Sequence, residues 1–118
     1  MKKISLILTM VLLYGCLSII NQNNANNIKI DKIIIPTAQC NMCVANIGKA
    51  LNGVDGILKY KVELETDQVK IKYNADMILL QGIERLISKA GYQANNLPAD
   101  VDAYNKLAMC CKLPKDRH

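Results

Sequence analysis

The sequence between residues 58 and 74 restricts the fold more than any other part, because apolar and polar residues alternate there with a period of two. The apolar members are Leu58, Tyr60, Val62 and Leu64 in a first run and Val69, Ile71 and Tyr73 in a second. Thr66 and Asp67 lie between the runs and are suited to a tight turn. A two-residue period gives a strand one apolar and one wet face. The runs therefore predict an antiparallel hairpin.

Segments with a helical period flank this hairpin. The first stripe consists of Val44, Ile47 and Leu51, and the second of Leu79, Leu80, Ile83, Leu86, Ile87 and Ala90, with Gly91 as a stop signal. A β-branched run from Ile28 to Ile35 precedes the first stripe, and a short segment from Tyr92 to Leu97 follows the second. This order predicts an α+β, ferredoxin-like βαββαβ sandwich, in which a four-stranded antiparallel sheet carries both helices on one face. A short C-terminal tail follows.

Two cysteines lie where the first predicted strand gives way to the first predicted helix. Cys40 and Cys43 are separated by two residues, which places two sulfur atoms at a strand-to-helix corner. Two thiolates can hold a soft ion such as Cu(I) at a low coordination number, whereas a structural zinc site normally takes four protein ligands. An open site with two ligands suits a carrier that must release its cargo. We therefore predict that Cys40 and Cys43 are metal ligands.

The first 27 residues have the pattern of an export signal and a spacer. Lys2 and Lys3 precede an apolar run that ends at Gly15-Cys16. This ending resembles a bacterial lipobox, which predicts a signal peptide over 1–15, lipidation of Cys16 and a polar, lipid-anchored spacer over 16–27. The alternatives are a cleaved soluble form and an uncleaved membrane anchor. All three place the folded domain, 28–97, outside the cytoplasm. The lipoprotein interpretation places it in a bacterial cell envelope, facing the periplasm or the exterior.

The cysteine count supports the lipoprotein interpretation. Five cysteines are an odd number for an exported chain, and assigning Cys16 to a lipid leaves four. Two of these, Cys110 and Cys111, lie in the tail, 98–118. They are either free tail thiols, disulfide partners of Cys40 and Cys43, or an auxiliary soft-metal site beside that pair. In an oxidising envelope, metal binding requires that the first pair stay reduced.

The composition argues against other classes of function. The formal net charge is +5, or about +3 without Lys2 and Lys3, and the lysines are spread between apolar positions. Phe and Trp are absent. Without a dense basic stripe or an aromatic platform, nucleic-acid binding is not expected. The sequence also lacks a Ser-His-Asp set, a phosphate-binding glycine loop and a catalytic carboxylate pair, so we do not expect an enzyme.

From about Ile28 to Leu97 the chain resembles the heavy-metal-associated domain family, which includes small copper chaperones, N-terminal modules of copper-transporting ATPases and the periplasmic mercuric-ion-binding protein. The resemblance rests on Cys40-x-x-Cys43, on Ala50-Leu51 with Val54-Asp55-Gly56-Ile57, on the hairpin from Val62 to Tyr73 and on Lys89-Ala90-Gly91-Tyr92. It implies that the sulfur atoms of Cys40 and Cys43 hold the metal and that Tyr92 packs beside the site. It also implies Cu(I) as the expected cargo, with Hg(II), Zn(II) or Cd(II) as further candidates. The implied partner is a metal-transporting ATPase or another metal-receiving protein.

The chain departs from the family pattern just before the first ligand. The family usually has Gly-Met-Thr there, and this chain has Thr37-Ala38-Gln39, so Ala38 replaces a buried Met. Met42 either fills part of that space or faces solvent. The functional alternative to metal binding is a thiol-disulfide oxidoreductase that uses the same two cysteines, because a CxxC at a helix start is also the thioredoxin-type arrangement. The chain lacks the aromatic residue usually found just before that motif.

Overall fold

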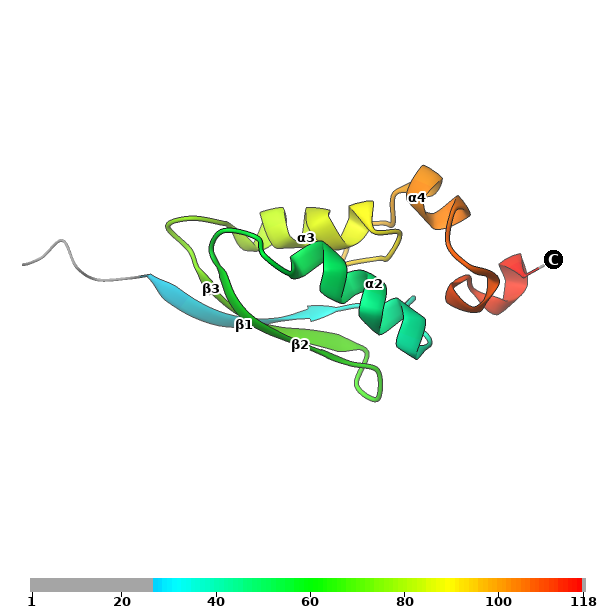
Figure 1. Cartoon of the computed structure of the whole chain (residues 1–118), viewed down its shortest axis with the longest axis horizontal. Helices are drawn as coiled ribbons and strands as arrows, with labels where there is room; N and C mark the ends of the chain where they lie inside the picture. Colours follow the sequence, from blue (N-terminus) through cyan, green and yellow to red (C-terminus); the bar gives the residue numbers. More distant parts are fainter. Residues whose placement is uncertain (1–26, 118) are drawn as a thin grey trace, which may run out of the picture.

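The computed structural model describes residues 27–117, which form an antiparallel sheet with helices on one face (Figure 1). The elements in chain order are β1 (Ile28–Ile34), α2 (Asn41–Leu51), β2 (Ile57–Glu63), β3 (Gln68–Asn74), α3 (Leu80–Lys89) and α4 (Val101–Asn105), followed by two 3-10 turns, η1 (Met109–Cys111) and η2 (Pro114–Asp116). The expected signal peptide, Cys16 and almost all of the spacer lie outside the described residues. Within residues 27–117, no helix is both long and apolar enough to span a membrane.

The predicted hairpin is present, and its second strand is the centre of the sheet. The strand order is β1-β3-β2, and both pairings are antiparallel. Val69 of β3 pairs with Ile33 of β1 on one side and with Val62 of β2 on the other. Ile33 and Val69 are fully buried. This row of three β-branched side chains crosses the sheet and lies on the covered face.

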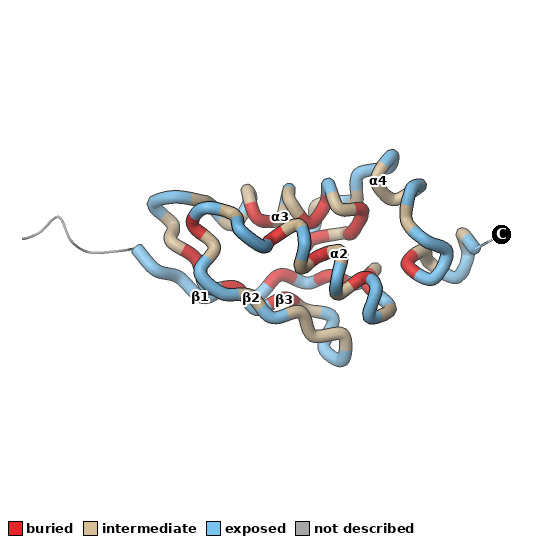
Figure 2. The backbone as a smooth tube through the Cα atoms, in the orientation of Figure 1, coloured by how far each residue is buried: buried red, intermediate tan, exposed pale blue. Residues whose placement is uncertain are grey.

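The core lies between the sheet and the helices α2 and α3, as the band of buried positions in Figure 2 shows. Its fully or almost fully buried aliphatic residues are Ile33, Ile35, Ile47, Leu51, Val69, Ile71, Ile83 and Ile87. Full burial of one such side chain contributes roughly 1.5–3 kcal/mol relative to exposure. The core therefore packs α2 against the sheet, and the CxxC pair lies at the first turn of α2.

The prediction of a fourth strand from Tyr92 to Leu97 is wrong, because the sheet of the described residues has three strands. Ala94 and Leu97 exchange backbone hydrogen bonds of 2.9 and 3.0 Å with each other, which closes a tight turn instead of a ladder. Asn95 inside this turn has φ +52°, a left-handed conformation that Asn tolerates better than most residues. Only Asn95 joins β1, where its backbone N–H donates to the Ile34 carbonyl and its Oδ1 accepts from the Ile34 N–H, both at 2.8 Å. Asn95 thus provides hydrogen-bond partners for the backbone N–H and carbonyl of Ile34 without extending the sheet.

The tail folds back toward the start of α2. The side chain of Asp100 accepts a 2.8 Å hydrogen bond from the Ala103 N–H and caps α4. The hydroxyl of Tyr104 donates to Asp116 at 2.6 Å and accepts from the Leu113 N–H at 2.9 Å. These bonds fix the bend between α4 and η2. As a result, η1 contacts α2.

Candidate metal centre

Cys40 and Cys43 lie at the first turn of α2 with their sulfur atoms 3.4 Å apart. Cys40 is the N-cap residue in an extended conformation, and Cys43 follows three residues later. Residues three apart on a helix share one face, so the CxxC spacing brings both thiols together. Cys43 is buried and Cys40 is partly exposed. One thiol thus belongs to the core and the other is open to solvent.

The two tail cysteines join this pair across the fold. Cys40 Sγ lies 3.8 Å from Cys110 Sγ and 3.8 Å from Cys111 Sγ, and the two tail sulfurs are 4.0 Å apart. Cys110 is exposed and Cys111 is buried, and all four thiols are free. The structure therefore gathers every cysteine of residues 27–117 at one point. We call Cys40, Cys43, Cys110 and Cys111 the cysteine cluster. The sequence left free tail thiols, disulfides to the first pair and an auxiliary site open; in the described residues the tail cysteines are free thiols that lie beside Cys40.

Tyr92 lies beside the cysteine cluster and is fully buried. Its hydroxyl accepts a 2.9 Å hydrogen bond from Nδ2 of Asn46 and also contacts Cys43 and Cys111. Burial is the main cause that raises the pKa of Tyr92 far above its usual range, and the contacts with Cys43 and Cys111 raise it further. Tyr92 therefore supplies a neutral hydroxyl at the inner wall of the site.

Asn46 is a site neighbour that the sequence analysis missed. Besides the bond to Tyr92, its Nδ2 lies 3.9 Å from Cys111 Sγ. Asn is a poor residue for a helix interior, and this Asn lies one turn after Cys43 on the same face. A polar residue three positions after Cys43, on the same helix face, was the sequence signal that could have identified Asn46.

Burial also raises the pKa of the Cys111 thiol to about 12, and its contacts with Cys43 and Cys40 act in the same direction. The thiol is therefore protonated in the metal-free protein at neutral pH.

Arg117 attaches the tail to the loop that precedes Cys40. Its Nη2 donates to Gln39 Oε1 at 3.1 Å and to the Cys110 carbonyl at 3.2 Å, and its Nε donates to the Lys112 carbonyl at 3.0 Å. These bonds are exposed to solvent. Of the three, the bond to Gln39 crosses from the tail to the loop that precedes Cys40, and the other two lie within the tail. No periodic pattern connects residues so far apart, which is why the sequence analysis did not find Arg117.

A model of the heavy-metal-associated (HMA) domain matches residues 32–93, just over half of the chain. The chain belongs to the heavy-metal-associated domain family. Among curated relatives, the copper chaperone CopZ of Enterococcus hirae is 34% identical over 55 residues, covering 47% of this chain and 80% of CopZ. CopZ of Staphylococcus aureus is 30% identical over 53 residues, covering 45% and 78% of the two chains. The matched region of this HMA protein ends before α4, so Cys110 and Cys111 lie outside it.

Solved structures share the fold of the HMA domain. A structure of CopZ metallochaperone has a TM-score of 0.54 at 24% identity and covers 56% of this chain and 98% of its own. Oxidised MerP from Ralstonia metallidurans CH34 has a TM-score of 0.55 at 24% identity, and the match covers 58% of this chain and 94% of the MerP chain. These likenesses concern the ferredoxin-like α+β domain with its two helices.

The unusual residues of this HMA domain's metal loop have distinct environments. Ala38 is buried under the loop, in contact with the core. Met42 does not fill that space: it is 49% exposed. The Cys110 thiol points toward the Met42 Sδ at 3.9 Å. Met42 thus places a fifth sulfur atom at the outer edge of the cysteine cluster.

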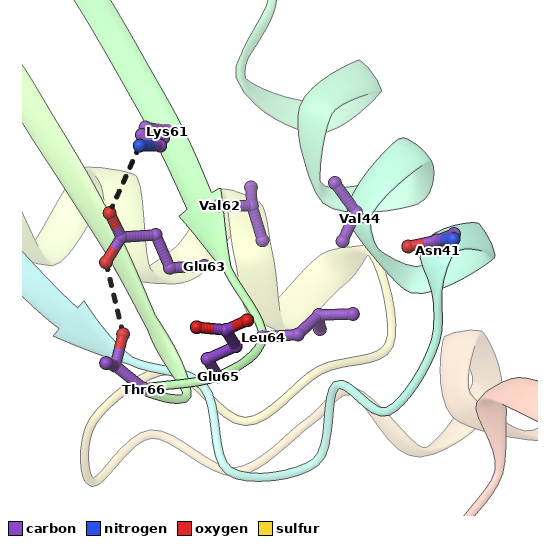
Figure 3. A pocket seen from close by; sticks show the side chains of 8 residues that line it. All are labelled: Asn41, Val44, Lys61, Val62, Glu63, Leu64, Glu65 and Thr66. Atoms are coloured by element: carbon purple, nitrogen blue, oxygen red, sulfur yellow. Dashed lines mark hydrogen bonds and ion pairs between the residues drawn. The ribbon is translucent and has the colours of Figure 1, made fainter.

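A surface hollow of about 600 Å³ separates the start of α2 from the β2–β3 hairpin of the HMA domain (Figure 3). It is lined by Asn41, Val44, Lys61, Val62, Glu63, Leu64, Glu65 and Thr66, and no cysteine takes part. The Glu63 carboxylate accepts from Thr66 at 3.1 Å and pairs with Lys61 at 3.5 Å. Glu63, Thr66 and Lys61 are thus paired with one another, and the lining holds no thiol, so the hollow offers no ligand set comparable to the cysteine cluster.

Proposed function

We propose that the protein binds a soft metal ion, Cu(I) in the first place, through Cys40 and Cys43, and carries or buffers it. The observation that carries this proposal is the 3.4 Å approach of two free thiols at the first turn of α2. Thiolates select soft ions such as Cu(I), and they also hold Hg(II) or Zn(II). The resemblance to proteins named copper chaperones favours Cu(I).

The different exposure of the two cysteines suggests how the ion leaves. Cys43 is buried and holds its place in the core, while Cys40 is partly exposed. An incoming thiolate of a receiving protein would therefore add to the ion from the side of Cys40. Two thiolates and a monovalent ion carry a net negative charge, which the N-terminal end of α2 stabilises.

The receiving protein is proposed to be a metal-transporting ATPase or another metal acceptor. The N-terminal domain of a potential copper-translocating P-type ATPase from Bacillus subtilis, solved in the Cu(I)-loaded state, has the same fold, with a TM-score of 0.55 at 22% identity. Two domains of one fold can present their cysteine loops to each other. Transfer would then proceed by ligand exchange without a large conformational change of the domain itself.

We further propose a location in the bacterial cell envelope, through a lipid on Cys16. The support is the sequence of residues 1–16 alone. Metabolic labelling with a radioactive fatty acid tests it. Label is expected in the wild-type chain and not in Cys16→Ser, and an unlabelled wild-type chain in the soluble fraction would contradict the anchor.

The metal site is tested by anaerobic titration of the reduced full chain with Cu(I) against a competing chelator. One tight equivalent is expected in the wild type and in Cys16→Ser, and its loss is expected in Cys40→Ser/Cys43→Ser. Absence of tight binding by the wild type would reject the proposal. Reduction of a disulfide substrate by that same chain would then favour the thiol-disulfide oxidoreductase.

A further inference from the structure

We propose that Cys110 and Cys111 are ligands of the same ion as Cys40 and Cys43, so that the tail closes a four-sulfur site for a single divalent d¹⁰ ion such as Zn(II) or Cd(II). This inference deepens the proposed function and rests on it. The two-cysteine site of the matched domain would thereby become a site of higher coordination number. Each thiol would lose its proton to solvent on binding, and no electron would be transferred.

The distances between the sulfur atoms favour four ligands over two. A tetrahedral ion with metal–sulfur bonds of about 2.3 Å separates its sulfur ligands by about 3.8 Å, and a linear two-sulfur complex needs about 4.6 Å. The sulfur of Cys40 lies 3.4 Å from that of Cys43 and 3.8 Å from both tail sulfurs, which are 4.0 Å from each other. These four of the six sulfur–sulfur distances are thus close to the edge of a tetrahedron before any ion is bound, and Cys43 is the sulfur that lies outside the group within 4.8 Å of one another.

Burial gives each member of the cluster a defined place around such an ion. Cys43 and Cys111 are buried and form the inner side, whereas Cys40 and Cys110 form the outer side. The sulfur atoms of Cys40, Cys110 and Cys111 alone all lie within 4.8 Å of one another, which suffices for a three-sulfur site. The buried Cys43 lies outside this group but contacts both Cys40 and Cys111, so it would join as the fourth ligand when the sulfurs close around the ion.

The balance of charge favours a divalent ion over a monovalent one. Four thiolates leave a net charge of about −2 around a divalent ion and about −3 around Cu(I). Positive partial charge comes from the first turn of α2, and a full positive charge comes from Arg117, whose Nη2 is 3.2 Å from the Cys110 carbonyl. Cu(I), with its lower coordination number, would use the cluster only in part.

The attachment of the tail also suggests how the closed site opens. The bond from Arg117 to Gln39, which joins the tail to the loop, is exposed, so water competes for it. When it breaks, the tail sulfurs can leave and expose the ion on Cys40 and Cys43. A receiving protein would meet the ion in that open state.

The test is a Cd(II) titration of the reduced full chain under argon, in a Cys16→Ser background that removes the fifth thiol. The cadmium–thiolate charge-transfer absorption measures the number of thiolate ligands, and a competing chelator gives the Kd. We expect one equivalent with four-thiolate intensity. In Cys110→Ser/Cys111→Ser the intensity should fall to about half, and the Kd should rise by at least about tenfold.

Two further variants guard against a misfolded tail. Cys110→Ser changes an exposed side chain and should remove about one quarter of the intensity. Met109→Ala is the matched control on η1, where Met109 is exposed, and it should retain the wild-type intensity and Kd.

The outcomes separate this inference from the proposed function. Equal intensity and Kd in wild type and in both tail variants would overturn the four-sulfur site while leaving the Cys40–Cys43 site intact. Binding of two equivalents with undiminished affinity would overturn the single-ion site. Failure of the wild type to bind either Cd(II) or Cu(I) would reject the proposed function as well.

Discussion

The side-chain amide of Asn46 donates a 2.9 Å hydrogen bond to the hydroxyl of Tyr92, and this bond joins α2 to the segment that follows α3. Asn46 lies one helical turn after Cys43, and Tyr92 is fully buried beside the cysteine cluster. The same amide lies 3.9 Å from Cys111 Sγ. One polar side chain therefore connects the helix, the inner wall of the site and the tail.

Replacing Asn46 with Ala should destabilise the fold, because it removes the donor to a buried hydroxyl. We expect the free energy of unfolding to fall by about 1–3 kcal/mol, measured by urea denaturation of the full chain. In a Tyr92→Phe background, Asn46→Ala should lower the free energy of unfolding by a smaller amount. The difference between the two backgrounds, which is the coupling energy of the pair, should be about 0.5 kcal/mol or more. Equal costs in the two backgrounds would show that the bond does not contribute.

Gly91→Ala should disturb the tail more than the domain core. Gly91 has φ +101°, and an added Cβ would lie 3.2 Å from the Ala103 backbone and 3.1 Å from the Leu107 side chain. The backbone cost alone is on the order of 1–2 kcal/mol. The crowding adds to it and should push α4 away. We therefore expect the tail cysteines to leave the cluster while Cys40 and Cys43 keep their position, which Cd(II) absorption can measure.

Gly53→Ala is the matched control for this change. Gly53 also has a positive φ, +73°, but an added Cβ would meet no atom within 4 Å. Gly53→Ala should therefore lower the stability through its backbone conformation, while Cys110 and Cys111 remain in the cysteine cluster. Loss of the tail ligands in Gly53→Ala, or their retention in Gly91→Ala, would contradict the role assigned to Gly91.

The hairpin tip should give the protein a weak dependence of stability on acid. The hydrogen bond from Gln68 is the main cause that lowers the pKa of Glu63 from 4.5 to about 2, with help from Thr66 and Lys70. Because the folded-state pKa is lower than the unfolded one, this contribution is complete above pH 4.5 and is lost as the pH falls toward about 2. Solvent screening at this surface position keeps the effect small.

Glu63→Gln should remove this dependence, because the amide does not titrate. The measurement is the urea midpoint of wild type and variant over that pH range. The two curves should converge at the acid end, separate as the pH rises from about 2 to 4.5, and keep a constant separation above pH 4.5. Parallel curves throughout would show that the Glu63 contacts do not contribute to stability.

Local patterns of the sequence were sufficient for the elements that form by local rules. The alternation around Val69 predicted the hairpin, and the CxxC spacing at a strand-to-helix corner predicted the approach of Cys40 and Cys43. The predicted last strand failed because Asn95 takes a left-handed turn and pairs with Ile34 through its side chain. Alternation in so short a segment does not distinguish a strand from a turn whose ends bond to each other.

The position of the tail could not be predicted, because it depends on contacts between residues about 70 positions apart in the chain. The sequence shows that Cys110 and Cys111 are soft ligands, and it cannot show that they reach Cys40. That approach depends on the cap at Asp100, on the bonds of Tyr104 and on the close packing at Gly91. Each of these contacts involves individual residues and no repeating sequence pattern, so none of them could be predicted from the sequence.

Arg117→Ala should speed the loss of the ion from the closed site without removing a sulfur ligand. Arg117 donates to Gln39 of the metal-binding loop, and to the Cys110 and Lys112 carbonyls within the tail, so its loss removes this link to the loop and loosens the end of the tail. Exposed bonds of this kind together contribute about 1 kcal/mol, which corresponds to an increase of about fivefold in the population with a detached tail. Transfer of Cd(II) to a chelator, followed by stopped-flow absorption, should accelerate by a similar factor.

Lys115→Ala is the control, because it removes the same charge from an exposed position of η2. This variant should transfer Cd(II) to the chelator at the wild-type rate. Equal acceleration in the two variants would assign the effect to net charge and would contradict a tail that opens at Arg117.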